Sequence, residues 1–399
     1  MSLNNVVKAE RLHIALFGKR NAGKSSLINA LTGQETALVS AVAGTTTDPV
    51  EKAMELLPLG PVVLIDTAGF DDEGALGEMR VQRTEGVLNK TDIALLVTEG
   101  AELDEKESAF LEKLRRRGKA VIVVHNKAEL LPALPEAKAG EIYVSALTGM
   151  GVEQLKNALG RLAGEQKSER RVIADLLSAG DRVVLVTPID AAAPKGRIIL
   201  PQQQTLRDIL DAGCTALVCQ PEQLSDTLSS LKEPPKMVVT DSQAFGAVSK
   251  ILPAEIPLTS FSILFARYKG DLLTQVRGAA ALSALKDGDR VLISEGCTHH
   301  RQCGDIGTQK LPRWIGEFTG VSPHFEFTSG GTFPEDVSPY KLIVHCGGCM
   351  LTEAQMASRL QIAAADKVPV INYGVAIAHI HGILRRSLEL FPEALALLK

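Results

Sequence analysis

Two groups of residues in this sequence have the types and spacing that chemistry requires. The segment Gly18–Ser25 fits the phosphate-loop pattern G-x4-G-K-S/T. The second group consists of two cysteine segments, Cys297-Thr298-His299 and His345-Cys346-Gly347-Gly348-Cys349. A phosphate loop binds a nucleotide, and clustered cysteines bind a metal or carry out redox chemistry. The sequence therefore predicts a nucleotide site and a sulfur-rich site in one chain.

The phosphate loop follows an aliphatic run and precedes a helical pattern, which is the context that the motif requires. Its glycines let backbone N–H groups surround the phosphates, and the helix N-terminus adds positive potential. We expect Lys24 to reach the β- and γ-phosphates and Ser25 to ligate Mg²⁺. The other residues expected to line the nucleotide here are Gly18, Asn21, Ala22, Gly23 and Ser26.

Three further segments follow strand-like runs in the order that a GTPase requires. In Asp66-Thr67-Ala68-Gly69, we expect Asp66 in the Mg²⁺ shell and the Gly69 amide at the γ-phosphate. The segment Asn126-Lys127-Ala128-Glu129 resembles the guanine-reading pattern N-K-x-D, with Glu129 in place of the usual Asp. Ser145-Ala146 matches the last guanine-contacting loop. Their shared place at strand ends predicts one binding crevice.

The two cysteine segments also follow strand-like runs, Arg290–Ile293 and Leu342–Val344. Three thiolates, from Cys297, Cys346 and Cys349, fit a [4Fe-4S] cluster with one differentiated iron. The same three cysteines with His299 or His345 would fit zinc, and the Cys-x-x-Cys pair alone would fit a redox centre. Spacing leaves these three alternatives open.

Composition limits the class of protein. The chain has 399 residues, of which 45% are hydrophobic and 23% charged, as in soluble globular proteins of two or three domains. The 43 Lys and Arg residues against 47 Asp and Glu residues disfavour a basic nucleic-acid binder. No apolar run reaches the length of a transmembrane helix, so we expect no membrane partner and a cytoplasmic protein. In that reducing compartment the six cysteines are free or metal-bound, and we expect Cys214, Cys219 and Cys303 to be bystanders.

Short aliphatic runs alternate with amphipathic stretches along the whole chain, which predicts an α/β protein with mostly parallel sheets. We expect a P-loop GTPase domain over residues 1–165 and two smaller α/β domains over residues 172–270 and 271–399. Thr352 and Gln355 predict a capping box at the start of a helix in the last domain.

The motifs resemble known families. The nucleotide motifs are similar to those of the Era/MnmE-like branch of the translation-factor-type GTPases. The pattern Cys297-x-His299, a gap of 45 residues, and then His345-Cys346-x-x-Cys349 resembles the signature of HydF, the family of [FeFe]-hydrogenase maturation GTPases. The second resemblance covers essentially the whole chain.

The HydF resemblance implies an activity and a set of cofactors. GTP would be hydrolysed with Mg²⁺. The segment Gly44–Asp48 looks like a first switch, in which we expect Thr46 to close on that ion, and the Era/MnmE-like resemblance implies that Asn21 supports a bound K⁺. Cys297, Cys346 and Cys349 would bind a [4Fe-4S] cluster with an exchangeable fourth site. His299 and His345 are then candidates for a fourth ligand or for a contact with the cargo.

The resemblance also implies partners. The middle domain would form a homodimer. The protein would be a scaffold that receives a diiron precursor of the H-cluster with the help of radical-SAM maturases and transfers it to apo-[FeFe]-hydrogenase. The alternative is an Era/MnmE-type GTPase of RNA modification or ribosome assembly, with a structural zinc/cysteine domain.

Overall fold

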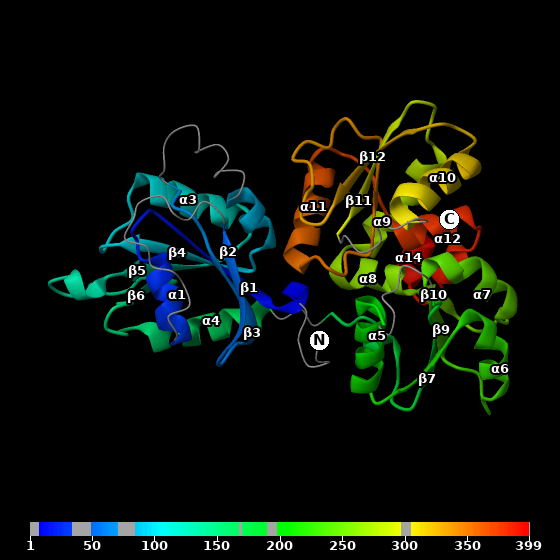
Figure 1. The fold of residues 1–399 in the computed structure, drawn as a ribbon, viewed down its shortest axis with the longest axis horizontal. Helices are drawn as coiled ribbons and strands as arrows, with labels where there is room; N and C mark the ends of the chain where they lie inside the picture. The colour runs from blue at the N-terminus through cyan, green and yellow to red at the C-terminus, as the bar shows by residue number, and fades with distance from the viewer. Residues whose placement is uncertain are drawn as a thin grey trace. The chain divides into compact units, whose positions relative to one another are not determined.

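The computed structural model describes residues 8–33, 49–70, 84–166, 170–189, 198–296 and 305–398. The chain divides into two compact units, Met1–Ser168 and Glu169–Lys399, and each is described by itself (Figure 1). Both units are α/β folds with mostly parallel sheets, as predicted. Within the described ranges, no helix combines the length and the apolar character needed to cross a membrane.

The N-terminal unit contains a six-stranded sheet in the order β2-β3-β1-β4-β5-β6. Every neighbouring pair is parallel except β2 and β3, which are antiparallel. The sequence did not predict β2, because this edge strand contains three charged residues, Glu51, Lys52 and Glu55, and only Leu56 is buried. The strands are β1 (Leu12–Gly18), β2 (Val50–Leu56), β3 (Gly60–Asp66), β4 (Ile93–Glu99), β5 (Ala120–Asn126) and β6 (Glu141–Tyr143).

Helices cover both faces of this sheet. Ile14 and Leu16 of β1 belong to a buried cluster with α1 (Lys24–Thr32) and α4 (Val152–Gln166). Ala15 and Phe17 point to the other face and pack in a cluster that includes Leu111 and Leu114 of α3 (Glu105–Arg116). This alternation follows from the pleat of a strand and explains why the run is apolar throughout.

The C-terminal unit contains two four-stranded parallel sheets, in the orders β10-β9-β7-β8 and β12-β11-β13-β14. The strands of the first are β7 (Arg182–Val186), β8 (Thr215–Cys219), β9 (Met237–Thr240) and β10 (Leu258–Ser260). The strands of the second are β11 (Arg290–Glu295), β12 (His324–Ser329), β13 (Leu342–His345) and β14 (Val370–Asn372).

The helices of this unit connect parallel strands or pack beside them. They are α5 (Leu200–Asp211), α6 (Leu224–Ser229), α7 (Phe245–Ile251), α8 (Phe261–Lys269), α9 (Leu272–Ser283), α10 (Leu311–Thr319), α11 (Glu353–Ala365), α12 (Tyr373–Ile380), α13 (Leu384–Ser387) and α14 (Pro392–Ala396). The two units also contain short helical turns at η1 (Lys8–Glu10), η2 (Ala128–Leu130), η3 (Ala174–Leu176), η4 (Pro221–Gln223), η5 (Ser242–Ala244) and η6 (Ile306–Lys310).

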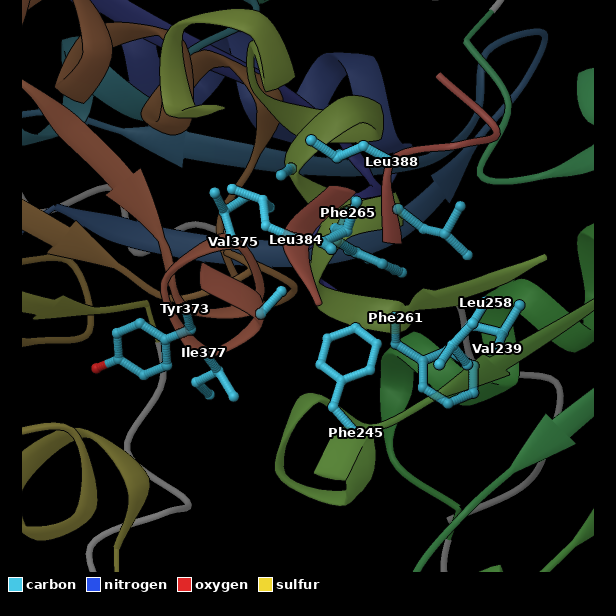
Figure 2. Close-up of a cluster of buried hydrophobic side chains, with 14 of the residues drawn as sticks. Val239, Phe245, Leu258, Phe261, Phe265, Tyr373, Val375, Ile377, Leu384 and Leu388 are labelled. Atoms are coloured by element: carbon cyan, nitrogen blue, oxygen red, sulfur yellow. The ribbon is translucent and has the colours of Figure 1, made fainter. Parts of the chain in front are cut away.

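One hydrophobic core runs through both sheets of the C-terminal unit. Figure 2 shows Phe245 and Phe261 gathered with Phe265, Ile377 and Leu384, side chains that come from both halves of the unit. Helix α8 contacts β10 of the first sheet and β14 of the second. The regions predicted as a middle and a last domain therefore share one buried core.

Two predicted elements differ from those observed. The sequence pattern over Val375–Leu388 predicts one helix, but the structure has two, α12 and α13, because the chain turns between them at Gly382, whose φ is 71°. The apolar run Val368–Ile371 predicts a strand from its first residue, but β14 begins only at Val370. Strand β12 was not expected either, since it lies at the edge of its sheet and has no fully buried residue.

Candidate functional site

The phosphate loop lies between β1 and α1, and its backbone carbonyls bind the side chain of Lys24. Lys24 is 7% exposed, and its Nζ donates to the carbonyls of Gly18 and Lys19 at 3.0 and 2.7 Å. Asn21 is exposed, with a φ of 62°, and Gly23 has a φ of 86°. Helix α1 begins at Lys24, so its N-terminus faces the loop as a phosphate site requires.

The two side chains expected at Mg²⁺ lie within one hydrogen bond of each other. Ser25 Oγ donates to Asp66 Oδ2 at 2.5 Å, where β3 ends. Burial raises the pKa of Asp66, while the Ser25 hydrogen bond and the charge of Lys24 oppose the rise. A hydroxyl and a carboxylate in this arrangement fit a hard cation that keeps several waters. Thr46, the third predicted group, lies outside the described residues.

Asn126 joins the phosphate loop to the predicted guanine-contacting loop. Its Nδ2 donates to the Ala22 carbonyl at 2.9 Å, and its Oδ1 accepts from the Ala146 N–H at 3.1 Å. A Cβ atom on Gly23 would lie 2.2 Å from that Nδ2, so glycine is needed there for the close approach. Segments more than a hundred residues apart are thus held in one arrangement.

The acidic residue of the guanine pattern is also tied to this loop. Glu129 accepts a hydrogen bond from the Ser145 side chain, which lowers the pKa of the Glu129 carboxyl. Lys127 has a φ of 59°, and its Nζ donates to Glu99 at 2.6 Å. The ionised carboxylate can accept from the two donors of a guanine edge. Phe70, directly after Gly69, stacks on the ring of Phe110, and the two ring centroids lie 4.7 Å apart.

The cysteine loop begins where β13 ends. Cys346 Sγ accepts hydrogen bonds from the N–H groups of Gly296, at 3.0 Å, and Gly348, at 3.4 Å. Because Gly296 directly precedes Cys297, the chain that carries the third predicted ligand passes this sulfur. Burial and the neighbouring Cys349 raise the pKa of the Cys346 thiol to about 11, and the two N–H donors oppose the rise.

The far end of the loop is fixed by a buried lysine. Lys269, at the end of α8, is 4% exposed, and its Nζ donates to the carbonyls of Cys349 and Leu351 at 3.1 and 2.8 Å. The predicted capping box then starts α11: Thr352 N–H donates to Gln355 Oε1 at 3.0 Å, and Gln355 N–H donates to Thr352 Oγ1 at 3.1 Å. The loop is therefore held on both sides of Cys349.

His345 is oriented by two hydrogen bonds. Its Nδ1 lies 2.8 Å from the Cys346 carbonyl, and its Nε2 lies 3.0 Å from Nη1 of Arg359. A guanidinium only donates, so Nε2 accepts and Nδ1 carries the proton that it donates to the carbonyl. Burial, followed by the charge of Arg359, lowers the pKa of His345 to about 3. Both ring nitrogens of this neutral histidine are engaged.

Part of the predicted metal site lies outside the described residues: Cys297, His299 and Cys303 fall in the undescribed segment 297–304. Over the described ranges, no three His, Cys, Asp or Glu side chains are grouped so that they could hold a metal ion. Cys346 and Cys349 are half-buried and in no disulfide bond, whereas Cys214 and Cys219 are buried at the first sheet.

Comparison with protein families decides what kind of chain this is. A model described as the hydrogen maturase F dimerization domain matches residues 172–270, and one described as the hydrogen maturase F tetramerization domain matches residues 273–390. The chain belongs to the HydF family. A model described as a 50S ribosome-binding GTPase matches residues 13–127. This HydF-family chain therefore carries a GTPase domain followed by the two domains described for hydrogen maturase F.

The HydF-family chain is also similar to curated GTPases over its first part. The tRNA modification GTPase MnmE of Nitrosospira multiformis is 38% identical over 167 residues, which cover 40% of this chain and 36% of that protein. MnmE of Xanthomonas oryzae pv. oryzae is 39% identical over 153 residues, covering 38% of this chain and 34% of that protein. The chain thus spans about a third of the length of the curated relatives it matches.

Solved structures are also similar to part of the HydF-family chain. A variant of Aquifex aeolicus Era bound to GDP and AlF4⁻ is 18% identical, covers 52% of this chain and 93% of its own, and has a TM-score of 0.34. The G domain of the T. maritima FeoB iron transporter is 24% identical and covers 39% of this chain and 99% of its own, with a TM-score of 0.31.

Two residues at the cysteine loop were missed by the sequence reasoning, Lys269 and Arg359. A signal for Arg359 was available, since Met356, Arg359 and Ala363 share the i, i+3, i+7 spacing of one helix face. That face of α11 is buried. An arginine on the buried face of a helix indicates a polar partner inside the protein. Lys269 offered no comparable signal, since it lies in the last turn of α8, where lysine is common.

Proposed function

We propose that this HydF-family chain is a GTP-hydrolysing scaffold and carrier in hydrogenase maturation. It would receive a diiron precursor with the help of radical-SAM maturases and transfer it to apo-[FeFe]-hydrogenase. Cys297, Cys346 and Cys349 would hold a [4Fe-4S] cluster, whose exchangeable iron position supplies the attachment point for the cargo. The hydrogen bond from Gly296 to Cys346 Sγ is the observation that carries the proposal, because it joins the residue directly before Cys297 to the sulfur of a second predicted ligand.

The chemistry of the described donors supports a metal centre over a redox-active cysteine pair, and it argues against zinc bound by His345. N–H groups directed at a sulfur stabilise a metal-bound thiolate. A redox-active Cys-x-x-Cys pair needs a lowered thiol pKa, whereas the pKa of Cys346 is raised to about 11. Zinc held by three cysteines and His345 would require a free ring nitrogen, and both are engaged.

Iron analysis of the full chain tests the cluster. Anaerobically reconstituted protein should bind about four irons per chain and give an EPR signal on reduction. Alanine substitution at Cys297, Cys346 or Cys349 should remove both. Cys214→Ala and Cys219→Ala are matched controls, since these cysteines are buried at the other sheet. Colourless protein with one tightly bound zinc would overturn the cluster assignment.

Nucleotide binding is proposed to time the contacts with partner proteins rather than to act on iron. The triphosphate and Mg²⁺ would be held by Lys24, Ser25, Thr46, Asp66 and the Gly69 amide. The guanine would be held by Asn126, Lys127, Glu129, Ser145 and Ala146. Lys24→Ala should abolish GTP hydrolysis, which phosphate release measures.

A bound K⁺ is proposed beside the phosphates, supported by Asn21, which is exposed at the tip of the loop. Hydrolysis should then be faster in KCl than in NaCl at equal ionic strength. Asn21→Ala should remove the difference and leave GDP binding intact. Equal rates of the native protein in the two salts would rule out this role.

The likeness to MnmE offers a second function, in RNA modification. It extends over 40% of this chain, so we propose that it reflects a shared GTPase domain only. The net charge of −4 also disfavours a strongly basic RNA-binding protein. Retention of the protein on RNA with a steep salt dependence would favour that function.

We further propose a homodimer formed through residues 172–270 in the cytoplasm, which sedimentation equilibrium would test.

A further inference from the structure

Arg359 is a buried arginine that binds the ends of three neighbouring strands. It is 4% exposed and lies on α11. Its Nη1 donates to Ser294 Oγ of β11 at 3.2 Å and to Nε2 of His345, the last residue of β13, at 3.0 Å. Its Nη2 donates to the carbonyls of Gly330, just after β12, at 2.6 Å, and Thr332 at 3.5 Å. The guanidinium therefore bridges the carboxyl edge of the second sheet.

Both cysteine segments leave from the strands that Arg359 joins. Cys346 directly follows β13, and Cys297 lies two residues beyond the end of β11. In the order β12-β11-β13 these strands are neighbours, and one side chain joins the strand ends after which the two segments follow in the sequence. The hydrogen bond from Gly296 to Cys346 Sγ lies at the same edge.

The charge of Arg359 has no acidic partner in the described part of the chain. Its four hydrogen-bond acceptors are a hydroxyl, a neutral imidazole and two carbonyls, and its guanidinium carbon lies 5.0 Å from the centroid of the Phe333 ring. A buried charge without a counter-ion is costly. Because Arg359 binds His345, the residue directly before Cys346, the thiolates of a bound cluster would supply the missing negative charge.

We propose that Arg359 is the positioning residue of the metal centre: it fixes the two cysteine segments against each other and offsets the negative charge of the metal–thiolate cluster. This inference rests on the proposed function, since it assumes that the cysteines bind a cluster. A cluster held by thiolates becomes one unit more negative on reduction. A fixed positive charge therefore stabilises the reduced form more than the oxidised form and raises the reduction potential.

Two substitutions separate the roles of geometry and charge. Arg359→Met removes both the charge and the hydrogen bonds, while Arg359→Lys keeps the charge and loses the two-pronged contacts with the strand ends. Arg386→Met is the matched control, because Arg386 also donates to backbone carbonyls, those of Ser249 and Leu252, but away from the cysteine loop. All variants are made in the full chain and reconstituted anaerobically with iron and sulfide.

The measurements are the rate of iron loss to a chelator and the reduction potential from an EPR-monitored titration. Arg359→Met should lose iron about 10–100-fold faster than the native protein, as expected for a group that orients metal ligands. Its cluster should also have a more negative potential. Arg359→Lys should lose iron faster with a potential near the native value, and Arg386→Met should match the native protein in both.

A folded Arg359→Met protein with the native rate of iron loss and the native potential would overturn the inference. Trp314 emission shows whether that variant folds. If it does not, Arg359→Lys is the test instead, and a native rate of iron loss in Arg359→Lys would overturn the inference. Failure of the native protein to take up iron contradicts the proposed function instead. If the native protein binds zinc instead of iron, the same variants are compared for zinc release, because a zinc–thiolate centre is also anionic. A native protein that binds neither metal refutes both the proposed function and the role of Arg359.

Discussion

Asn126→Ala tests the arrangement of the nucleotide site through two hydrogen bonds. The Asn126 side chain is 2% exposed, donates to the Ala22 carbonyl at 2.9 Å and accepts from the Ala146 N–H at 3.1 Å. Alanine would leave both backbone groups without this partner. Each buried group left unpaired costs about 1–2 kcal/mol, so the free energy of unfolding of the N-terminal unit should fall by about 2–4 kcal/mol.

Nucleotide affinity should fall with the same change. Without Asn126 the phosphate loop and the Ser145–Ala146 loop are no longer held together before the nucleotide arrives, and binding must order them. We expect GDP to bind about 10–100-fold more weakly, which corresponds to about 1.4–2.8 kcal/mol. A fluorescent GDP analogue titrated against the full chain measures this.

The position of the single tryptophan makes the stability measurement specific. Trp314 lies on α10 of the C-terminal unit, so its emission follows unfolding of that unit alone, while far-UV circular dichroism follows both units. In urea, Asn126→Ala should shift the dichroism transition and leave the Trp314 transition in place. Asn89→Ala is the matched control, since the bond between Asn89 and Arg117 is exposed and 3.4 Å long. Unfolding and GDP binding equal to those of this control would refute the reasoning.

Other contacts predict further outcomes. Glu129→Ala should weaken GTP binding about tenfold and reduce the preference for GTP over ITP, because it removes the carboxylate that Ser145 holds; an unchanged preference in competition binding would contradict this. Burial lowers the pKa of His13 below 6.5, so between the two pKa values the unfolded chain binds more protons than the folded one. The N-terminal unit should therefore lose stability as the pH falls below 6.5, and His13→Gln should flatten the pH dependence of its urea midpoint. Thr352→Ala removes the cap of α11 and should lower the free energy of unfolding of the C-terminal unit by about 1 kcal/mol; an unchanged urea midpoint from Trp314 emission would show that the cap contributes nothing.

The sequence predicted the elements whose signal is local. Central strands such as β1 and β4 are apolar on both faces, so a short run of aliphatic residues is enough to identify them. The edge strands β2 and β12 lack that signal, because one side of each is open and polar residues are tolerated there. Their existence depends on pairing with a neighbour, which composition does not record.

The functional residues divide in the same way. The phosphate loop and the capping box at Thr352 were found because each is defined by residues a few positions apart. Lys269 was missed because the carbonyls it binds, those of Cys349 and Leu351, lie about eighty residues further along the chain. Arg359 was missed for a related reason, since Ser294 is sixty-five residues away.

By itself the sequence determined the chemistry available to this protein: a phosphate loop, the segments that follow it in the order of a GTPase, and cysteines at the ends of two strands. Order and spacing along the chain are enough for that. Only the tertiary structure decided that both ring nitrogens of His345 are engaged and that one of them accepts from the buried guanidinium of Arg359. Burial and hydrogen-bond direction arise from elements that are distant in sequence and meet only at the edge of the folded sheet.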